Sequence, residues 1–135
     1  MLTPDLINTS LANELPGKQY VCHEIGEDYV VCRQEIGPEV LRPGELVSGP
    51  TQFAMCDGAL WYLSFVVLGR IELMAVTSEL SIRFLRPAQG TVLWARATLD
   101  KPGRRTIVGT VRVWCDEDRD RPVSTAQGTY VVPRS

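Results

Sequence analysis

A single aspartate interrupts a long apolar stretch of the sequence. Asp57 is the only acidic residue between positions 46 and 71, and a carboxylate can act as a general base for water or as a direct nucleophile. A lone aspartate can also be purely structural, because its oxygens can accept hydrogen bonds from a buried hydroxyl or a backbone amide. Both interpretations are open on the residues alone, and Asp57 is the first candidate for chemistry.

The preceding Ser48-Gly49-Pro50 has the residues of a helix start, with serine as a cap and proline in the first turn. A helix N-terminus offers free backbone N–H groups and the positive end of the helix dipole, and both can stabilise an oxyanion. Pro50 has no N–H, so the candidate donors are the amides of Gly49, Thr51 and Gln52. Ser48 either caps the helix alone or also contacts a substrate.

Two further side chains have open roles. Trp61, one turn after Asp57, either lines a pocket beside it or fills the core. His23 is the only histidine and is expected on the surface of a strand. Its isolation excludes a Ser-His-Asp triad unless His23 itself supplies the base.

Residues 50–68 are predicted to form the helix that positions Asp57 and Trp61. The stretch is apolar on nearly every face, which a surface helix would not tolerate. Its most apolar part, residues 53–68, is interrupted by Asp57 and Gly58 and is shorter than the roughly 20 residues that a bilayer requires. A helix buried inside the protein is therefore expected, rather than a membrane span.

The rest of the chain is predicted to supply the sheet that encloses this helix. A short amphipathic helix is expected over 4–15, within an N-terminal segment 1–17, and Pro16-Gly17 ends it. The segment 19–36 has the pattern of a hairpin around Gly26-Glu27-Asp28. Four further strand-like runs cover about 74–84, 93–99, 106–114 and 123–132. The segment 37–44 is rich in turn residues and is expected to break regular structure.

This order of elements predicts one α+β domain over residues 1–135, a curved antiparallel sheet of five to six strands around one long helix. Small residues such as Ala95, Ala97 and Gly109 fit a sheet that curves tightly and lies close to a helix. The length of 135 residues and the hydrophobic content of 44% are typical of a single domain.

Charge and cysteine content exclude some classes of function. A net charge of −2 gives no global electrostatic case for binding nucleic acid or an anionic membrane. The first residues have no basic region followed by an apolar run, so we expect a cytoplasmic protein. The four cysteines lack CxxC or zinc-knuckle spacing, so we expect free thiols and no metal site.

The segment 46–57 resembles the phenylacetic-acid-type branch of the hotdog-fold acyl-CoA thioesterases. In that branch a His-Gly-Gly turn opens the central helix, and an acidic residue follows nine positions after the His. Here Ser48 takes the place of the His, Gly49 and Pro50 take the places of the two glycines, and Asp57 is the acid. Segments 76–88, 109–113 and 126–130 extend the resemblance over roughly residues 36–132.

The resemblance implies a hotdog fold and hydrolysis of an acyl-CoA thioester to the free acid and coenzyme A. It implies Asp57 as general base or nucleophile and the amides around Gly49 as the oxyanion hole. Related enzymes place a hydroxyl near the reacting carbon where this chain has Thr77 and Ser78, although hydroxyls are also common in strands.

The family also implies self-association. Asp57 lies about 10 Å along the helix from its start. The carboxylate and the amides at the helix start of the same chain are therefore too far apart to act on one carbonyl. In the family, the helix start of one subunit is paired with the acid of the other, so a homodimer or a homotetramer is expected.

Coenzyme A is expected only as part of the substrate, with no separate cofactor. Basic residues at two strand ends and one turn either form a phosphate-binding patch for coenzyme A or are solvated charges. These are Arg83, Arg86, Lys101, Arg104 and Arg105. The residues expected to contact the substrate are Ser48, Pro50, Thr51, Trp61, Thr77 and Ser78, and Trp61 either lines the acyl pocket or fills the core.

Two functions from different classes are open on this sequence. The first is an acyl-CoA thioesterase. The second is a non-catalytic acyl or acyl-CoA binding dimer, favoured by Ser48 and Pro50 at positions where the family has His and Gly. The hydratases and dehydratases of the same fold need a catalytic histidine at the helix start, which this chain lacks.

Overall fold

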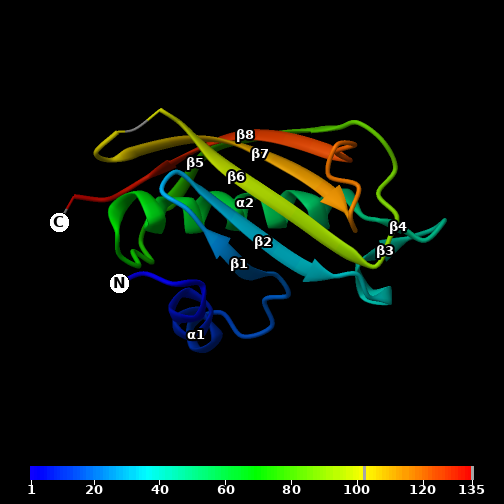
Figure 1. Ribbon diagram of the computed structural model, residues 1–135, viewed down its shortest axis with the longest axis horizontal. Coiled ribbons are helices and arrows are strands. Elements are labelled where there is room, and N and C mark those ends of the chain that lie inside the picture. The colour runs from blue at the N-terminus through cyan, green and yellow to red at the C-terminus, as the bar shows by residue number, and fades with distance from the viewer. Residues whose placement is uncertain (102, 135) are drawn as a thin grey trace.

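The computed structural model describes residues 1–101 and 103–134. Its order of elements is the predicted one, with a short helix, a hairpin, a long helix and four strands (Figure 1). The helices are α1 (Pro4–Glu14) and α2 (Gly49–Leu68). The strands are β1 (Val21–Ile25), β2 (Tyr29–Glu35), β3 (Leu41–Arg42), β4 (Leu46–Val47), β5 (Val76–Phe84), β6 (Val92–Lys101), β7 (Thr106–Cys115) and β8 (Ser124–Val131).

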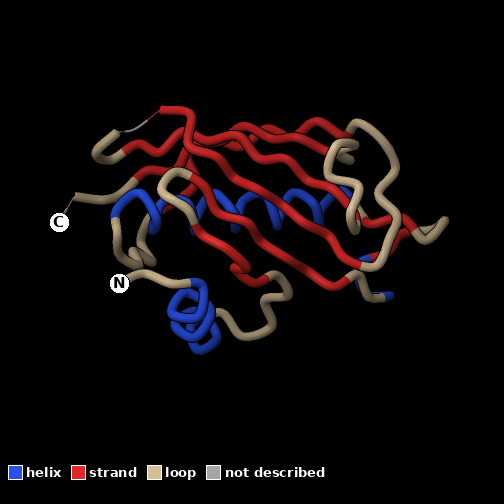
Figure 2. The backbone as a smooth tube through the Cα atoms, in the orientation of Figure 1, coloured by secondary structure: helices blue, strands red, loops and turns tan. Residues whose placement is uncertain are grey.

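Six strands form one antiparallel sheet in the order β1-β2-β6-β7-β8-β5. α2 lies along one face of this sheet and contacts all six strands (Figure 2). The arrangement confirms the predicted α+β fold, in which a curved antiparallel sheet wraps around one central helix. The two ends of the sheet are β1 and β5, so β5 lies far from the hairpin although it follows α2 in the sequence.

The segment between the hairpin and α2 is more regular than expected. Residues Pro38–Val40 form one 3-10 turn, and β3 pairs with β4 as a separate two-stranded ladder. Gly44 and Glu45 both have positive φ, at 93° and 60°, which closes the tight turn between these strands. Such a short ladder is set by its turn rather than by a strand pattern, so the alternation of residue types does not reveal it.

α2 begins at Gly49, one residue before the predicted start, and Gly69 ends it with a left-handed φ of 74°. Its 20 residues make it the one helix in the described residues that is long and apolar enough to cross a membrane. The expectation that this stretch is too short for a span is therefore wrong. Burial against the sheet accounts for its apolar character, because Leu60, Leu63 and Phe65 are completely buried.

α1 covers the open edge of the sheet at β1. The Asn8 side chain donates to the Cys22 carbonyl and accepts from the Cys22 amide, both at 2.8 Å. It thereby takes the place of a further strand at this edge. Ile7 and Leu11 on the same helix are fully buried.

A pair of glycines sets how closely α2 approaches the sheet. Gly109 of β7 and Gly128 of β8 are direct cross-strand partners. A Cβ atom at Gly109 would lie 2.8 Å from Leu60 Cδ2, and one at Gly128 would lie 2.5 Å from Leu60 Cδ1. The absence of both side chains lets Leu60 fit against the backbone of the sheet, which confirms the expected role of Gly109.

We predict that Gly128→Ala destabilises the fold by about 1–3 kcal/mol, because the added methyl group overpacks the contact with Leu60. The measurement is the free energy of unfolding in urea. Gln127→Ala, on the exposed side of the same strand, is the matched control and should change it by less than about 0.5 kcal/mol. In a Leu60→Ala background the added effect of Gly128→Ala should shrink; an undiminished effect would show that Leu60 is not the obstacle.

Candidate active site

The Asp57 carboxylate is held by two hydroxyl groups from the sheet. Thr77 Oγ1 donates to Asp57 Oδ1 at 2.6 Å, and the Tyr130 hydroxyl donates to the same oxygen at 2.7 Å. The Tyr130 hydroxyl also lies 3.0 Å from the Asp57 backbone carbonyl. Asp57 Oδ2 has no hydrogen bond to any described residue. One oxygen is therefore restrained, and the other is free to meet a water molecule or a substrate.

The register between β5 and β8 brings the two hydroxyls together. Thr77 and Tyr130 are direct cross-strand partners, so their side chains lie on the same face of the sheet, next to α2. A β-bulge follows at once, because Glu79 pairs with Thr129 and Ser78 is left over. Ser78 is exposed and makes no hydrogen bond to Asp57 in the described structure. Of the two predicted hydroxyls, Thr77 is thus at the carboxylate and Ser78 is not.

The Tyr130 hydroxyl keeps its proton and is the donor to Asp57. The Tyr130 ring is buried, and burial together with the Asp57 carboxylate raises the pKa of the Tyr130 hydroxyl well above its usual range. Sequence patterns give no sign of this residue as part of the site. Its position in the ladder could be known only from the register of β5 against β8.

Tyr20 is a second aromatic residue beside Asp57. A Cβ atom at Gly58 would lie 2.2 Å from Tyr20 Cε1, so the ring rests directly on the helix backbone next to Asp57. Burial raises the pKa of the Tyr20 hydroxyl, with further contributions from Cys32 and Asp57. A glycine in the middle of a buried helix indicates such a close approach, and this was the one sequence signal that could have pointed to Tyr20.

The helix start is capped as expected. Ser48 Oγ accepts from the Thr51 amide at 3.3 Å and lies 2.7 Å from Thr51 Oγ1. The Gln52 amide donates to the Ser48 carbonyl at 3.3 Å. Two of the three predicted oxyanion donors are therefore engaged within the helix. Only the Gly49 amide has no hydrogen bond to the described residues.

A groove of about 390 Å³ lies at this helix start, with Gly49, Phe84 and Arg86 among the residues that line it. The Phe84 ring covers Gly49, since a Cβ atom there would lie 3.2 Å from Phe84 Cζ. Gln52 also lines the groove and is almost fully buried. Its Nε2 donates to the Val47 carbonyl at 3.2 Å, whereas its Oε1 has no partner in the described structure.

Trp61 lies on the same incompletely covered side of α2 as Asp57. It is half-buried, and its ring centroid lies 5.3 Å from that of Phe65. Thr51 is half-buried and Pro50 is exposed on the first turn of the helix. The spacing from Pro50 through Asp57 to Trp61 follows one face of α2, so these predicted contacts share a side.

The four arginines predicted to bind coenzyme A do not gather in one place within the chain. Arg86 lines the groove at the start of α2, and Arg83 lines a separate cavity on β5 and β8. Arg104 and Arg105 line a third cavity beside Leu68, at the end of α2. A common role in binding coenzyme A stays a prediction.

His23 and the cysteines lie outside this site. His23 packs edge-on against Trp94, which projects from the other face of the sheet. The four cysteines are free, although Cys22 and Cys32 face each other across the hairpin. Burial raises the pKa of Cys22 and Cys56 to about 12, so neither thiol ionises at neutral pH. No three His, Cys, Asp or Glu side chains within residues 1–101 and 103–134 are grouped to hold a metal ion.

Comparisons with known proteins bear on the family and the fold. The family model described as the thioesterase superfamily matches residues 44–121. No curated protein matches the chain. Among solved structures, a putative thioesterase from Silicibacter sp. TM1040 is 30% identical, covers 99% of this chain and 94% of its own, and superposes with a TM-score of 0.86.

Two further structures are similar. The PaaI protein of the phenylacetic acid degradation operon of E. coli is 21% identical over 97% of this chain and 89% of its own, with a TM-score of 0.75. A Bacillus halodurans protein solved with CoA is 30% identical over 75% of this chain and 65% of its own, with a TM-score of 0.64. The matches confirm the prediction of a hotdog-fold thioesterase, and the chain belongs to the thioesterase superfamily.

Proposed function

We propose that this chain hydrolyses acyl-CoA thioesters to a free acid and coenzyme A, with Asp57 as the catalytic carboxylate. The observation that carries the proposal is the carboxylate held through Oδ1 by Thr77 and Tyr130, with Oδ2 free. In a purely structural role, either carboxylate oxygen of an aspartate can accept hydrogen bonds from neighbouring groups. In Asp57 both hydrogen bonds go to Oδ1, so Oδ2 is left available for chemistry.

The free oxygen can act in either of two ways. As a general base, Oδ2 takes a proton from water while the water oxygen attacks the thioester carbonyl, and the tetrahedral intermediate then expels the thiolate of coenzyme A. As a nucleophile, Oδ2 attacks the carbonyl itself, the tetrahedral intermediate expels the thiolate of coenzyme A to leave a mixed anhydride, and water then hydrolyses the anhydride to the free acid and the Asp57 carboxylate. Thr77 and Tyr130 serve both routes, because they fix the direction in which Oδ2 points.

The oxyanion in either route needs a donor, and the Gly49 amide is the candidate. Gly49 and Asp57 are eight residues apart on α2, which corresponds to about 12 Å along the helix. One thioester carbonyl cannot contact both groups of the same chain. We therefore place the Gly49 amide of a second copy opposite Asp57.

The edge of the sheet at β5 is the surface through which two copies would pair. Its outward N–H and C=O groups face no other strand of the described chain. Large apolar side chains are exposed at its two ends, with Met74 just before the strand at 67%, Val76 at 56% and Phe84 at 52%, and the exposed charged residues Glu79 and Arg83 lie between them. A long edge whose backbone groups are unpaired is a template for pairing with another strand. Thr77 and Phe84 lie on this strand, so pairing would bring Asp57 and Gly49 of different copies to one interface.

The choice of a coenzyme A thioester is supported by two features. The similar protein from Bacillus halodurans was solved with CoA. In this chain Arg86 lies in the groove beside Gly49, where a guanidinium group could meet a phosphate of the substrate.

A non-catalytic acyl-CoA binding protein is the second candidate. It is favoured by the helix start, where Pro50 has no N–H and the Thr51 amide is already bonded to Ser48. An oxyanion site with a single amide would be weaker than one with two or three donors.

We predict that the protein releases thiol from at least one member of a panel of acyl-CoAs, and that Asp57→Asn lowers kcat by about 10²–10⁴-fold. The matched control is Asp100→Asn, because Asp100 also accepts a hydrogen bond from a threonine, Thr110, at 2.5 Å. The control should keep wild-type turnover. Full activity of Asp57→Asn would refute the proposal, and coenzyme A binding without turnover of any thioester would establish the second candidate.

We further predict that Thr77→Val and Tyr130→Phe each lower kcat by about 10- to 100-fold with little change in KM, because the carboxylate loses its fixed direction. Thr77→Ser keeps the hydroxyl and should restore most of the activity. Steady-state kinetics on the best thioester, with thermal unfolding to confirm folding, provide the measurement. If both variants keep kcat within twofold of wild type, the two hydroxyls are not needed to position Asp57.

A further inference from the structure

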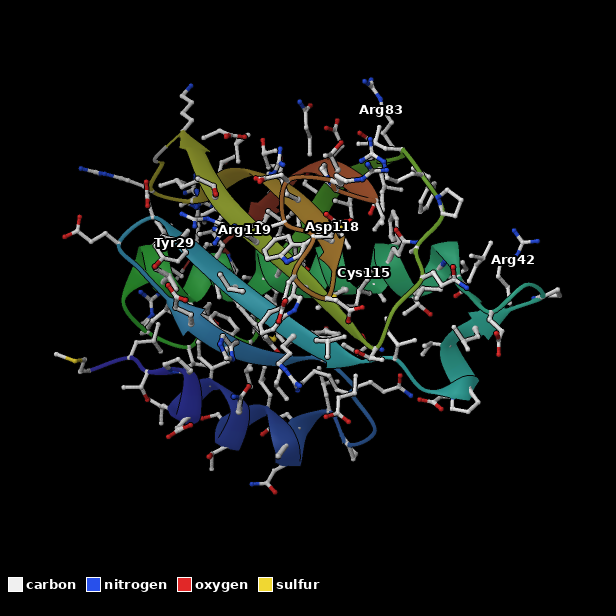
Figure 3. All side chains as sticks on the ribbon, turned by 45° about the vertical axis from the view of Figure 1, so that its right-hand side comes forward. Tyr29, Arg42, Arg83, Cys115, Asp118 and Arg119 are labelled. Atoms are coloured by element: carbon white, nitrogen blue, oxygen red, sulfur yellow. The ribbon has the colours of Figure 1, made fainter. Side chains whose placement is uncertain are left out.

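A cavity on the sheet lies away from Asp57. It has a volume of about 680 Å³ and is lined by residues of β1, β2, β6, β7 and the loop that follows β7. Along β6, Ala95 and Ala97 are buried toward α2, whereas Trp94 and Arg96 alternate with them and line the cavity. The cavity therefore lies on the face of the sheet opposite to α2. Figure 3 shows Tyr29 and Arg119 in front of the sheet on this side.

Two indole rings form the floor of this cavity. Trp94 and Trp114 are direct cross-strand partners, and their rings lie 6.4 Å apart at an interplanar angle of 12°. His23 packs against Trp94 at 4.9 Å and 80°. Trp114 is almost fully buried, while Trp94 is half-buried and keeps part of its surface open. The open ring surface of the pair therefore belongs to Trp94.

Positive groups flank the aromatic floor. The Arg119 guanidinium lies 5.3 Å from the centre of the Trp114 ring, and the Arg96 guanidinium lies 4.0 Å from that of Tyr29. Neither arginine forms an ion pair with the residues that the structure describes. Both guanidinium groups therefore keep donors that an anion could accept.

Two of the three carboxylates around the cavity are already used within the protein. Asp116 Oδ1 accepts from the Thr91 amide, the Thr91 hydroxyl and the Val92 amide at 2.8–2.9 Å. Glu24 accepts a hydrogen bond from the Tyr29 hydroxyl. Glu117, on the exposed loop, is the remaining carboxylate of the lining. Accepting these hydrogen bonds does not remove the negative charge of Asp116 or Glu24, so the lining holds three carboxylates and two guanidinium groups. The charged hydrogen-bond donors that it offers to a ligand are Arg96 and Arg119.

We propose that this cavity binds a planar aromatic anion, that is, a flat ring system that carries a carboxylate or phosphate group. The ring stacks on Trp94, and the anionic group is held by Arg96 and Arg119. The volume falls within the range of small-molecule sites, of the order of 300–1,000 Å³. The site is separate from Asp57, so the proposal does not depend on the thioesterase activity.

The test is calorimetric titration of the full-length protein with 2-naphthoate. We expect saturable binding with one molecule per chain. The uncharged 2-naphthamide and the non-aromatic cyclohexanecarboxylate should each bind at least about tenfold more weakly, because each lacks one of the two interactions.

Variants then locate the bound molecule. Trp94→Leu and Arg119→Gln should each weaken naphthoate binding by about tenfold or more. Arg119 is on an exposed loop, so its variant tests the site even if Trp94→Leu fails to fold. Arg121→Gln is the matched control, because Arg121 lies on the same loop but pairs with Asp118 at 3.8 Å. Glu117→Gln should tighten binding by removing a negative charge.

Several results would overturn the proposal. They are absence of saturable binding, equal binding of the amide, and binding that survives both Trp94→Leu and Arg119→Gln. Binding that Asp57→Asn abolishes would place the probe at the thioesterase site instead. If naphthoate binding is lost under conditions in which the protein forms a larger oligomer, this face of the sheet is covered by a second copy.

Discussion

The contact between Leu60 and the glycine pair Gly109–Gly128 fixes the distance between α2 and the sheet, and the position of Asp57 depends on it. Leu60 lies one helical turn after Asp57, and Tyr130 lies two residues after Gly128 on the same face of β8. The register that places a glycine under Leu60 therefore also places a hydroxyl under Asp57. The same strand pairings of β8 set both the packing of Leu60 and the position of the hydroxyl at Asp57. A substitution at Gly109 or Gly128 that moves α2 away from the sheet therefore also moves Asp57.

This arrangement explains how an apolar helix can carry one charged group. Removing a carboxylate from water is unfavourable unless hydrogen bonds replace the lost hydration. Thr77 and Tyr130 supply two such bonds to one oxygen. The other oxygen accepts no hydrogen bond from the described residues, and the bond to Thr77 places the carboxylate next to the edge strand β5. A site that is only half enclosed by its own chain is consistent with a second copy completing it.

Sequence patterns predicted the long helix and the six strands of the main sheet. The apolar run over 50–68 indicated α2, the alternation after residue 74 indicated four strands, and the isolation of Asp57 made it the candidate for chemistry. Gly109 could be assigned to a close helix contact because glycine in a strand interior has few other uses.

Side-chain partners depend on register, which the sequence does not give. Tyr130 and Thr77 are 53 positions apart and meet only because β5 pairs with β8, at the far edge from β2. The bulge at Ser78 decides which of two adjacent hydroxyls reaches Asp57, and no residue type marks it. Strand order also explains why the four arginines lie apart. Arg86 lies near the start of α2 and Arg104 and Arg105 lie near its end, although the sequence places all of them at similar strand ends and turns.

The central claim is that the Asp57 carboxylate of one chain works with the Gly49 amide of another, and mixed dimers test it most directly. Asp57→Asn removes the carboxylate, and Gly49→Pro removes the amide at a position where proline is tolerated in a helix. Each variant alone should be nearly inactive. After subunit exchange, the mixture should recover about a quarter of wild-type activity, because half of the dimers are mixed and each has one complete site. A mixture no more active than the sum of its parts, or an active monomer, would contradict the account.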